Sequence, residues 1–256
     1  MKTKSNSVAG EASVIKWQES LVGIDALLLL TSPVFYGIGI PRGDDSGVIM
    51  FPGFMHGDTY LMLMYSWLSR IGYRPYYSGI LINAECPDLL VKSQLLDLVD
   101  SVAEETGGKV HLIGHSLGGV IARSLARQRQ RAVASVISLG SPLRGALLHR
   151  SILRETEVVR RFIQQEHGVR VPPECYTTHC HCNFMESYRK GVPPKIPQTS
   201  IYTRDDGVLD WRACRSGRGD VDVVVHGTHA GLAFNTEAYA VIARRLAKVA
   251  QPALAL

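Results

Sequence analysis

Short strand-like runs of apolar residues alternate with longer amphipathic stretches along most of this chain of 256 residues. Strands that alternate with helices favour a mostly parallel sheet covered by helices on both faces. We therefore expect an α/β fold, organised as a single domain over residues 1–256. The predicted strands are residues 46–54, 74–80, 109–115, 133–142, 197–207 and 220–229, and the main predicted helices are 59–73, 87–107, 116–128 and 236–250.

The segment 144–196 does not follow this alternation. It contains a charged helical stretch, a proline-rich turn and a cluster of cysteines. The simplest placement is an insertion over the carboxyl edge of the sheet, where ligands bind in folds of this type. We expect this segment to form a short cap or lid within the domain.

The charge balance is basic, with a formal net charge of +5 and a pI near 9.0. A basic balance can indicate a nucleic-acid partner when the cations form one patch. Here the arginines are spread over several predicted helices, without one compact block and interleaved aromatic residues. Such a distribution is typical of solvated helix faces, and we predict no nucleic-acid partner.

Residues 21–40 are the only stretch apolar enough to be considered as a membrane span. Asp25, Pro33 and three glycines interrupt it, and its most apolar part, ALLLL, is short. We expect a helix followed by a loop and no transmembrane span, with peripheral contact to lipid still compatible with the composition. The N-terminal residues lack the apolar core of a signal peptide, so we expect a cytoplasmic location.

Five cysteines occur in the chain, and three of them lie in the stretch CYTTHCHC, residues 175–182. Without an export signal a disulfide framework is not expected. The spacing C-x4-C-x-C of Cys175, Cys180 and Cys182 matches none of the common zinc patterns. Free thiols, or a local cross-link such as one to Cys214, are favoured over a metal site, and we predict no metal and no cofactor.

The motif GHSLG places Ser116 between two glycines in the pattern G-x-S-x-G. A predicted strand precedes this motif and a predicted helix follows it, which is the context in which the pattern has chemical meaning. A sharp turn from strand to helix exposes the serine hydroxyl, and the free N–H groups at the helix start can stabilise an oxyanion. The pattern predicts that Ser116 is a nucleophile.

A serine nucleophile needs a histidine base and a carboxylate, in the chain order Ser, acid, His. Among the downstream histidines, only His226 and His229 follow a predicted strand and precede a predicted helix, and we favour His229 because its neighbours are small. For the acid, Asp206 precedes a glycine at a predicted turn, and Asp205 is the alternative. Asp210 fits a capping or supporting role.

Two backbone N–H groups are expected to form the oxyanion hole. One belongs to Leu117, and the other is predicted to be that of Phe54, in the glycine-containing loop 51–58 that follows a predicted strand. Apolar side chains that could bind an acyl chain are Met55, Leu143 and Leu147, although each of them could equally belong to the core.

Several segments together resemble the α/β-hydrolase family, and more narrowly the bacterial lipase- and esterase-like serine hydrolases. These segments are VIMFPGF, LSRIGY, VHLIGHSLGGVIAR, VISLGSPLRG, SIYTRDDGVLDWRAC and GTHAGLAFN. The resemblance implies an α/β-hydrolase fold, a triad of Ser116, Asp206 and His229, and ester chemistry without a cofactor. Two departures are Pro52-Gly53, where many lipases have His-Gly, and the short basic insertion at 144–196.

The same triad serves several reactions, since an acyl-enzyme can be resolved by water or by another nucleophile. We rank hydrolysis of carboxylic esters first and a thioesterase or acyltransferase reaction second. A non-catalytic binding protein with this fold is a third reading, although no triad member is missing. The expected partner is a small-molecule or lipid-like acyl compound.

Overall fold

The computed structural model describes residues 19, 22–144, 150–167, 180–218 and 221–249. Six parallel strands form one sheet in the order β2-β1-β3-β4-β5-β6. The prediction of a mostly parallel sheet is confirmed. The strands are β1 (Gly47–Phe51), β2 (Arg74–Tyr77), β3 (Val110–His115), β4 (Val133–Leu139), β5 (Gln198–Tyr202) and β6 (Asp222–Val224).

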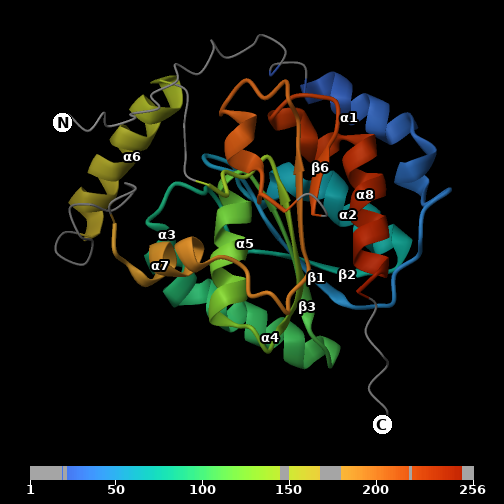
Figure 1. Cartoon of the computed structure of the whole chain (residues 1–256), viewed down its shortest axis with the longest axis horizontal. Helices are drawn as coiled ribbons and strands as arrows, with labels where there is room; N and C mark the ends of the chain where they lie inside the picture. Colours follow the sequence, from blue (N-terminus) through green and yellow to red (C-terminus); the bar gives the residue numbers. More distant parts are fainter. Residues whose placement is uncertain (1–18, 20–21, 145–149, 168–179, 219–220, 250–256) are drawn as a thin grey trace, which may run out of the picture.

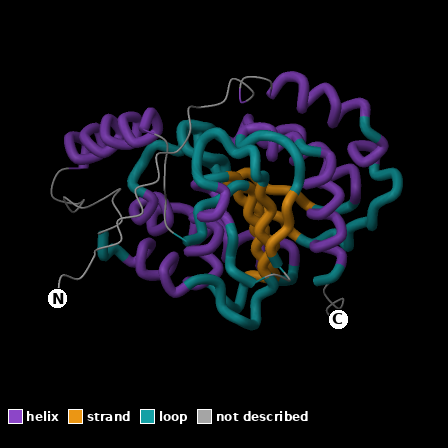
Figure 2. The backbone as a smooth tube through the Cα atoms, turned by 45° about the horizontal axis from the view of Figure 1, so that its top comes forward, coloured by secondary structure: helices purple, strands orange, loops and turns teal. Residues whose placement is uncertain are grey.

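Helices surround this sheet, as the tube in Figure 2 shows. The α-helices are α1 (Val22–Thr31), α2 (Met62–Ile71), α3 (Pro87–Leu90), α4 (Leu96–Thr106), α5 (Leu117–Gln128), α6 (Arg150–His167), α7 (Asn183–Lys190) and α8 (Thr236–Ala247). Shorter turns of 3-10 helix are η2 (Pro33–Tyr36), η3 (Asp58–Leu61), η6 (Trp211–Cys214) and η7 (Ala230–Phe234).

Alternate residues of the strands pack into two separate cores, because successive side chains of a strand point to opposite faces. On one face, Met50 and Ile113 join a core with residues of α1, α2 and α8. On the other face, Ile49 and Leu112 join a core with residues of α4, α5 and α7. The central strands β1, β3 and β4 are therefore buried on both sides, as expected for a parallel sheet, whereas the edge strands β2 and β6 are partly exposed.

The predicted single helix 87–107 is interrupted in the structure. A π-helical turn, η4 (Val91–Leu95), separates α3 from α4. Val91 and Leu95 are both buried in the core, so the apolar stripe continues across the turn. The sequence pattern does not reveal the interruption, because the positions that face the sheet stay apolar on both sides of it.

The described helices of the segment 144–196 pack in two different places. Helix α7 lies against α5, where the Ser124 hydroxyl donates to the carbonyl of Phe184 (3.3 Å). Helix α6 lies at the opposite side of the molecule from α1 (Figure 1), and its Val159 and Ile163 pack with Cys86. Helix α6 thus packs against the loops that carry Phe54 and Cys86, while α7 belongs to the layer on one face of the sheet and reaches the loop after β4 through the bond of the Tyr188 hydroxyl to the carbonyl of Pro142.

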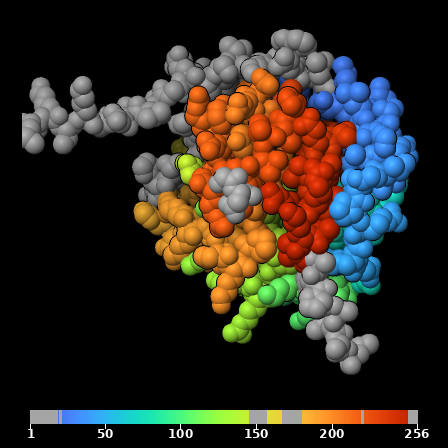
Figure 3. Space-filling view, turned by 45° about the vertical axis from the view of Figure 1, so that its right-hand side comes forward, coloured from blue at the N-terminus to red at the C-terminus, as the bar shows by residue number. Residues whose placement is uncertain are grey.

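Helix α1 and η2 cover α8 and η7, and Figure 3 shows the N-terminal segment alongside the C-terminal helix. Buried Leu29 anchors α1 to this core, whereas Leu27 and Leu28 are exposed. At a rise of about 1.5 Å per residue, the ten residues of α1 span about 15 Å, half of a bilayer core. None of the helices in the described part of the chain is a candidate membrane span.

Candidate active site

Ser116 occupies a strained turn between the end of β3 and the start of α5. Its backbone has φ 52° and ψ −118°, a region that non-glycine residues seldom adopt, and its N–H donates to the carbonyl of Leu139 (2.8 Å). Such strain persists only where surrounding structure enforces it, and it is concentrated at functional sites. A Cβ at Gly114 would overlap the backbone of Gly118, and one at Gly118 would overlap the carbonyl of Phe51. The close turn therefore requires both glycines.

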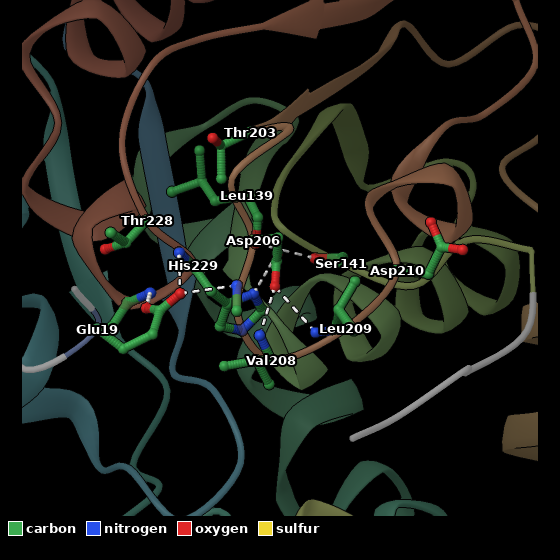
Figure 4. Close-up of polar contacts among 12 residues, drawn as sticks. Glu19, Leu139, Ser141, Thr203, Asp206, Val208, Leu209, Asp210, Thr228 and His229 are labelled. Carbon is green, nitrogen blue, oxygen red and sulfur yellow. Dashed lines mark hydrogen bonds and ion pairs between the residues drawn. The ribbon is translucent and has the colours of Figure 1, made fainter. Parts of the chain in front are cut away.

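Asp206 and His229 form a buried pair, which Figure 4 shows. The Nδ1–H of His229 donates to Oδ2 of Asp206 at 2.6 Å. The other carboxylate oxygen, Oδ1, accepts from the N–H groups of Val208 and Leu209, both at 2.9 Å. These bonds fix the carboxylate, and its bond to Nδ1 leaves Nε2 of His229 as the free basic nitrogen.

The alternative carboxylates have other positions. Asp205 is exposed, and the Asp210 carboxylate accepts from the N–H of Arg212 (2.9 Å) at the start of η6. Figure 4 shows Asp210 directed away from His229. The alternative base His226 has a side chain that is 95% exposed, and it pairs with Glu237 at 3.1 Å. The structure therefore brings Asp206 to His229 and leaves the competing residues at the surface.

His115, next to Ser116, links the serine turn to the loop that carries His229. Its Nε2–H donates to the backbone carbonyl of His229 (2.9 Å), and the two imidazole centroids are 5.1 Å apart. Among the described residues, no hydrogen bond joins the Ser116 hydroxyl to the His229 imidazole. In free enzymes this bond often forms only when substrate binds. The three predicted residues therefore lie in one region, but the hydrogen bond between the Ser116 hydroxyl and the His229 imidazole is not formed.

The pKa values of these two histidines are shifted in opposite directions. Burial lowers the pKa of His229, but the charge and hydrogen bond of Asp206, with the charge of Glu19, raise it, and the net direction is upward. Burial, with the nearby charge of His229, lowers the pKa of His115 to about 3. His115 is thus neutral and keeps its structural proton on Nε2, while His229 can exchange a proton.

The loop after β1 lies directly against the serine turn. A Cβ at Gly53 would be only 2.9 Å from Nδ1 of His115 and 3.2 Å from Cβ of Ser116, so glycine permits this approach. Phe54 follows and packs in the cluster with Cys86 and α6. Leu117 is the first residue of α5, where an N–H has no acceptor inside the helix. The two predicted oxyanion donors therefore belong to the segments that flank Ser116.

The predicted acyl-binding residues differ in accessibility. Met55 is 50% exposed, while Leu143 is only 5% exposed and belongs to the interior. Leu147 lies outside the described residues. Next to Met55 the structure adds Leu81 and Ile82, which are 89% and 59% exposed. The accessible apolar surface at this edge is thus made by Met55 and the loop 81–82.

Sequence reasoning missed Glu19, whose carboxylate binds the backbone on either side of the Asp206–His229 pair. Its partners are 188 to 211 residues away along the chain, so no local spacing could reveal the contact. The role of His115 was also missed, although this residue lies inside the GHSLG motif. Its bond to the carbonyl of residue 229 depends on tertiary structure alone.

The cysteine cluster is only partly described. Cys180, Cys182 and Cys214 are free thiols, Cys86 is buried, and Cys175 lies outside the described residues. Cys214 is buried with Tyr202 and Leu209, in a different cluster from Cys86. Within the described ranges, no three His, Cys, Asp or Glu side chains are grouped as a metal site would require.

Comparison with protein families gives a match to the palmitoyl protein thioesterase family over residues 89–192. The matched segment includes Ser116 but neither Asp206 nor His229. A shorter segment of 54 residues is 48% identical to a triacylglycerol lipase of Pseudarthrobacter phenanthrenivorans. It covers 21% of this chain and only 17% of that lipase, so the match concerns a fragment of each protein.

Solved structures resemble this chain over most of its length. A monoglyceride lipase from Saccharomyces cerevisiae superposes with a TM-score of 0.56 at 17% identity, covering 85% of this chain and 90% of that one. A monoacylglycerol lipase from Paleococcus ferrophilus gives a TM-score of 0.56 at 13% identity, with 82% and 97% covered. At these identities the likeness concerns the fold.

Proposed function

We propose that this chain, which has the α/β-hydrolase fold and is similar to lipases and esterases, hydrolyses carboxylic esters with Ser116 as nucleophile. One observation carries the proposal: the buried bond of 2.6 Å between Asp206 and His229, beside a serine held at positive φ. The three side chains come from three separate segments, and together they supply the nucleophile, the base and the carboxylate that acyl transfer needs.

In the proposed reaction, Nε2 of His229 takes the proton of Ser116 as the serine oxygen attacks the substrate carbonyl. Asp206 keeps the imidazole in the tautomer with Nδ1–H and stabilises the imidazolium that forms. The N–H groups of Leu117 and Phe54 bind the developing oxyanion. His229 then protonates the leaving alcohol, and water attacks the acyl-enzyme with His229 again as base, which releases the acid and restores Ser116.

A lipid-like acyl group is supported by the apolar surface beside the site. The N–H of Met55 donates to the carbonyl of Asn83 (3.1 Å), which holds the loop after β1 against the exposed residues Leu81 and Ile82. Exposed apolar side chains grouped at the rim of a site favour an apolar ligand. We propose that this rim contacts the acyl chain of the substrate, and a lipid surface where the substrate is part of one.

A second candidate reaction is the hydrolysis of acyl thioesters. The family match over residues 89–192 favours it, because the matched family is named for thioesterase activity. The same acyl-enzyme arises from either substrate, since the two differ only in the leaving group. An acyltransferase would use that intermediate with an alcohol or amine acceptor in place of water.

Fluorophosphonate labelling tests the proposal without knowledge of the substrate. We expect one label per chain, located at Ser116 by peptide mass spectrometry, and none in Ser116→Ala. Ser101, exposed on α4, gives the matched control Ser101→Ala, which should label like the unmodified protein. Folded protein that takes up no label would contradict the proposal and favour a binding protein.

Esters and thioesters with the same acyl chain then separate the two reactions. Chain lengths from short to long, assayed with and without an alcohol acceptor, identify the preferred leaving group. A higher kcat/KM for esters supports the first proposal, whereas a preference for thioesters supports the second. Product esters formed only with the acceptor would indicate acyl transfer.

A further inference from the structure

Glu19 brings a second carboxylate to the region around His229. Its Oε1 accepts from the backbone N–H groups of Gly207 (2.9 Å) and His229 (3.0 Å). Its Oε2 accepts from the N–H of Ala230 (2.8 Å). Figure 4 shows the Glu19 carboxylate turned toward the backbone of His229. One side chain therefore binds both the turn that follows Asp206 and the loop that carries the base.

We propose that Glu19 is a positioning residue, which holds the Asp206 turn and the His229 loop at a fixed separation for catalysis. This inference rests on the proposed function, since it assigns Glu19 a part in the same site. Glu19 does not touch the reacting atoms, because its partners are backbone N–H groups.

The backbone around His229 depends on side chains from distant segments. Glu19 accepts from the N–H groups of His229 and Ala230, His115 donates to the carbonyl of His229 (2.9 Å), and Tyr60 donates to the carbonyl of Ala230 (2.7 Å). All four polar backbone groups of these two residues are thus bonded to side chains. Glu19 supplies both acceptors in this set.

A carboxylate suits this position better than a neutral amide. The three N–H groups require two acceptor oxygens, whereas a glutamine side chain has one. Bonds from N–H to an ionised carboxylate are also roughly twice as strong as neutral ones. Replacement by glutamine therefore loosens the link between residues 207 and 229, where a misplacement of about 1 Å can reduce turnover about 100-fold.

The Glu19 charge also acts on the base itself. Burial lowers the pKa of His229, while Asp206 and then Glu19 raise it above its ordinary value. Titratable and charged groups from several elements lie near His229. They are Asp206, Glu19, His115 and Tyr60, and Asp25 lies beside Glu19. Loss of the Glu19 charge removes a contribution that favours the imidazolium, so the acid limb of kcat/KM should move to lower pH.

The experiment compares Glu19→Gln, Glu19→Asp and the unmodified chain. We expect Glu19→Gln to lower kcat about 10- to 100-fold, with a smaller change in KM, and to move the acid limb to lower pH. Glu19→Asp keeps the charge on a shorter side chain, so kcat should fall while the acid limb stays near its original position. Glu237→Gln is the matched control, because Glu237 binds the neighbouring His226 at the surface, and it should change neither quantity.

A titration by NMR makes the test independent of turnover. In the background of Ser116→Ala, the imidazole of His229 is followed with and without Glu19→Gln, and its signal is assigned with His229→Gln. A downward displacement of the midpoint supports the inference. Unchanged kcat, acid limb and midpoint in Glu19→Gln would overturn it while leaving the hydrolase proposal intact. Absence of labelling and turnover in the unmodified chain would instead refute the hydrolase proposal. The midpoint of the His229 titration would still show whether Glu19 acts on His229.

Discussion

The Nε2–H of His115 donates to the backbone carbonyl of His229 across 2.9 Å, so the residue before the nucleophile supports the loop of the base. His115 lies at the end of β3 and is buried. Its low pKa, about 3, keeps the ring neutral under ordinary conditions because burial disfavours the charged form. The strand that positions Ser116 therefore also positions His229, through one side chain.

Replacing His115 by phenylalanine tests this link. The change keeps a buried ring but removes one donor, so the carbonyl of His229 loses its bond from His115 and keeps the longer bond from the N–H of Leu232 (3.4 Å), at a cost of about 0.5–1.5 kcal/mol. We expect a lower Tm and a kcat reduced about 10-fold or more, measured with any ester that the unmodified chain hydrolyses.

His111→Phe is the control for that variant. His111 lies at the other end of the same strand, is equally buried, and bonds through Nδ1 to the Ser135 hydroxyl at 2.7 Å. It should lose stability but keep kcat. Equal losses of kcat in both variants would show that the effect of His115→Phe is general destabilisation.

The identity of the acid is tested by Asp206→Asn against Asp205→Asn. An amide at 206 cannot stabilise the imidazolium, and its NH2 group favours the wrong tautomer of His229. A change of this kind lowers kcat by a factor on the order of 10⁴ in serine hydrolases. Asp205 is exposed, so Asp205→Asn should alter kcat less than about 3-fold. The opposite ranking would assign the acid to Asp205.

Local sequence patterns predict the sheet and the serine turn well. The strand-to-helix turn at Ser116 needs glycines at 114 and 118, and these are visible in the sequence as G-x-S-x-G. The glycine after Asp206 likewise indicates the turn that carries the acid, and the structure places that turn beyond the end of β5 at Tyr202. Both features depend on residues that are close together in the chain.

Contacts between distant segments could not be predicted in this way. Glu19 meets residues 207–230 only because α1 packs on η7, and no spacing in the sequence encodes that packing. The division of segment 144–196 between α6 and α7 has the same origin. Amphipathic helices show that they bury one face, but their sequences do not say against which partner.

Stability should depend on pH through His111. Burial lowers its pKa from 6.5 to about 4, so the folded chain favours the neutral ring. The unfolded chain binds a proton below pH 6.5, and the stabilisation from the neutral ring is therefore lost as the pH falls from about 6.5 to about 4. We expect the free energy of unfolding to decrease by up to about 3 kcal/mol from this group across that interval.

Thermal unfolding of the unmodified chain and of His111→Phe at several pH values measures this contribution. Below pH 6.5, Tm should decline less steeply in the variant, whatever its starting Tm. Parallel curves for the two proteins would show that His111 does not supply the pH dependence. His115, with a pKa lowered to about 3, adds a contribution of the same sign in both proteins.

The positive φ of Ser116 should carry a measurable cost in stability. At φ 52° and ψ −118°, a residue with a Cβ is strained by about 1–3 kcal/mol, whereas glycine adopts such angles readily. Ser116→Ala keeps the strain, whereas Ser116→Gly relieves it. The gain in the free energy of unfolding is reduced by about 0.5–1 kcal/mol, because glycine has greater freedom in the unfolded chain. Both variants lack the nucleophile, so the difference between their Tm values reflects the backbone conformation at residue 116. We expect the Tm of Ser116→Gly to exceed that of Ser116→Ala by about 2–4 °C for each kcal/mol gained. A Tm of the glycine variant that is lower than that of Ser116→Ala by the equivalent of about 0.5–1 kcal/mol would mean that the turn holds Ser116 without strain.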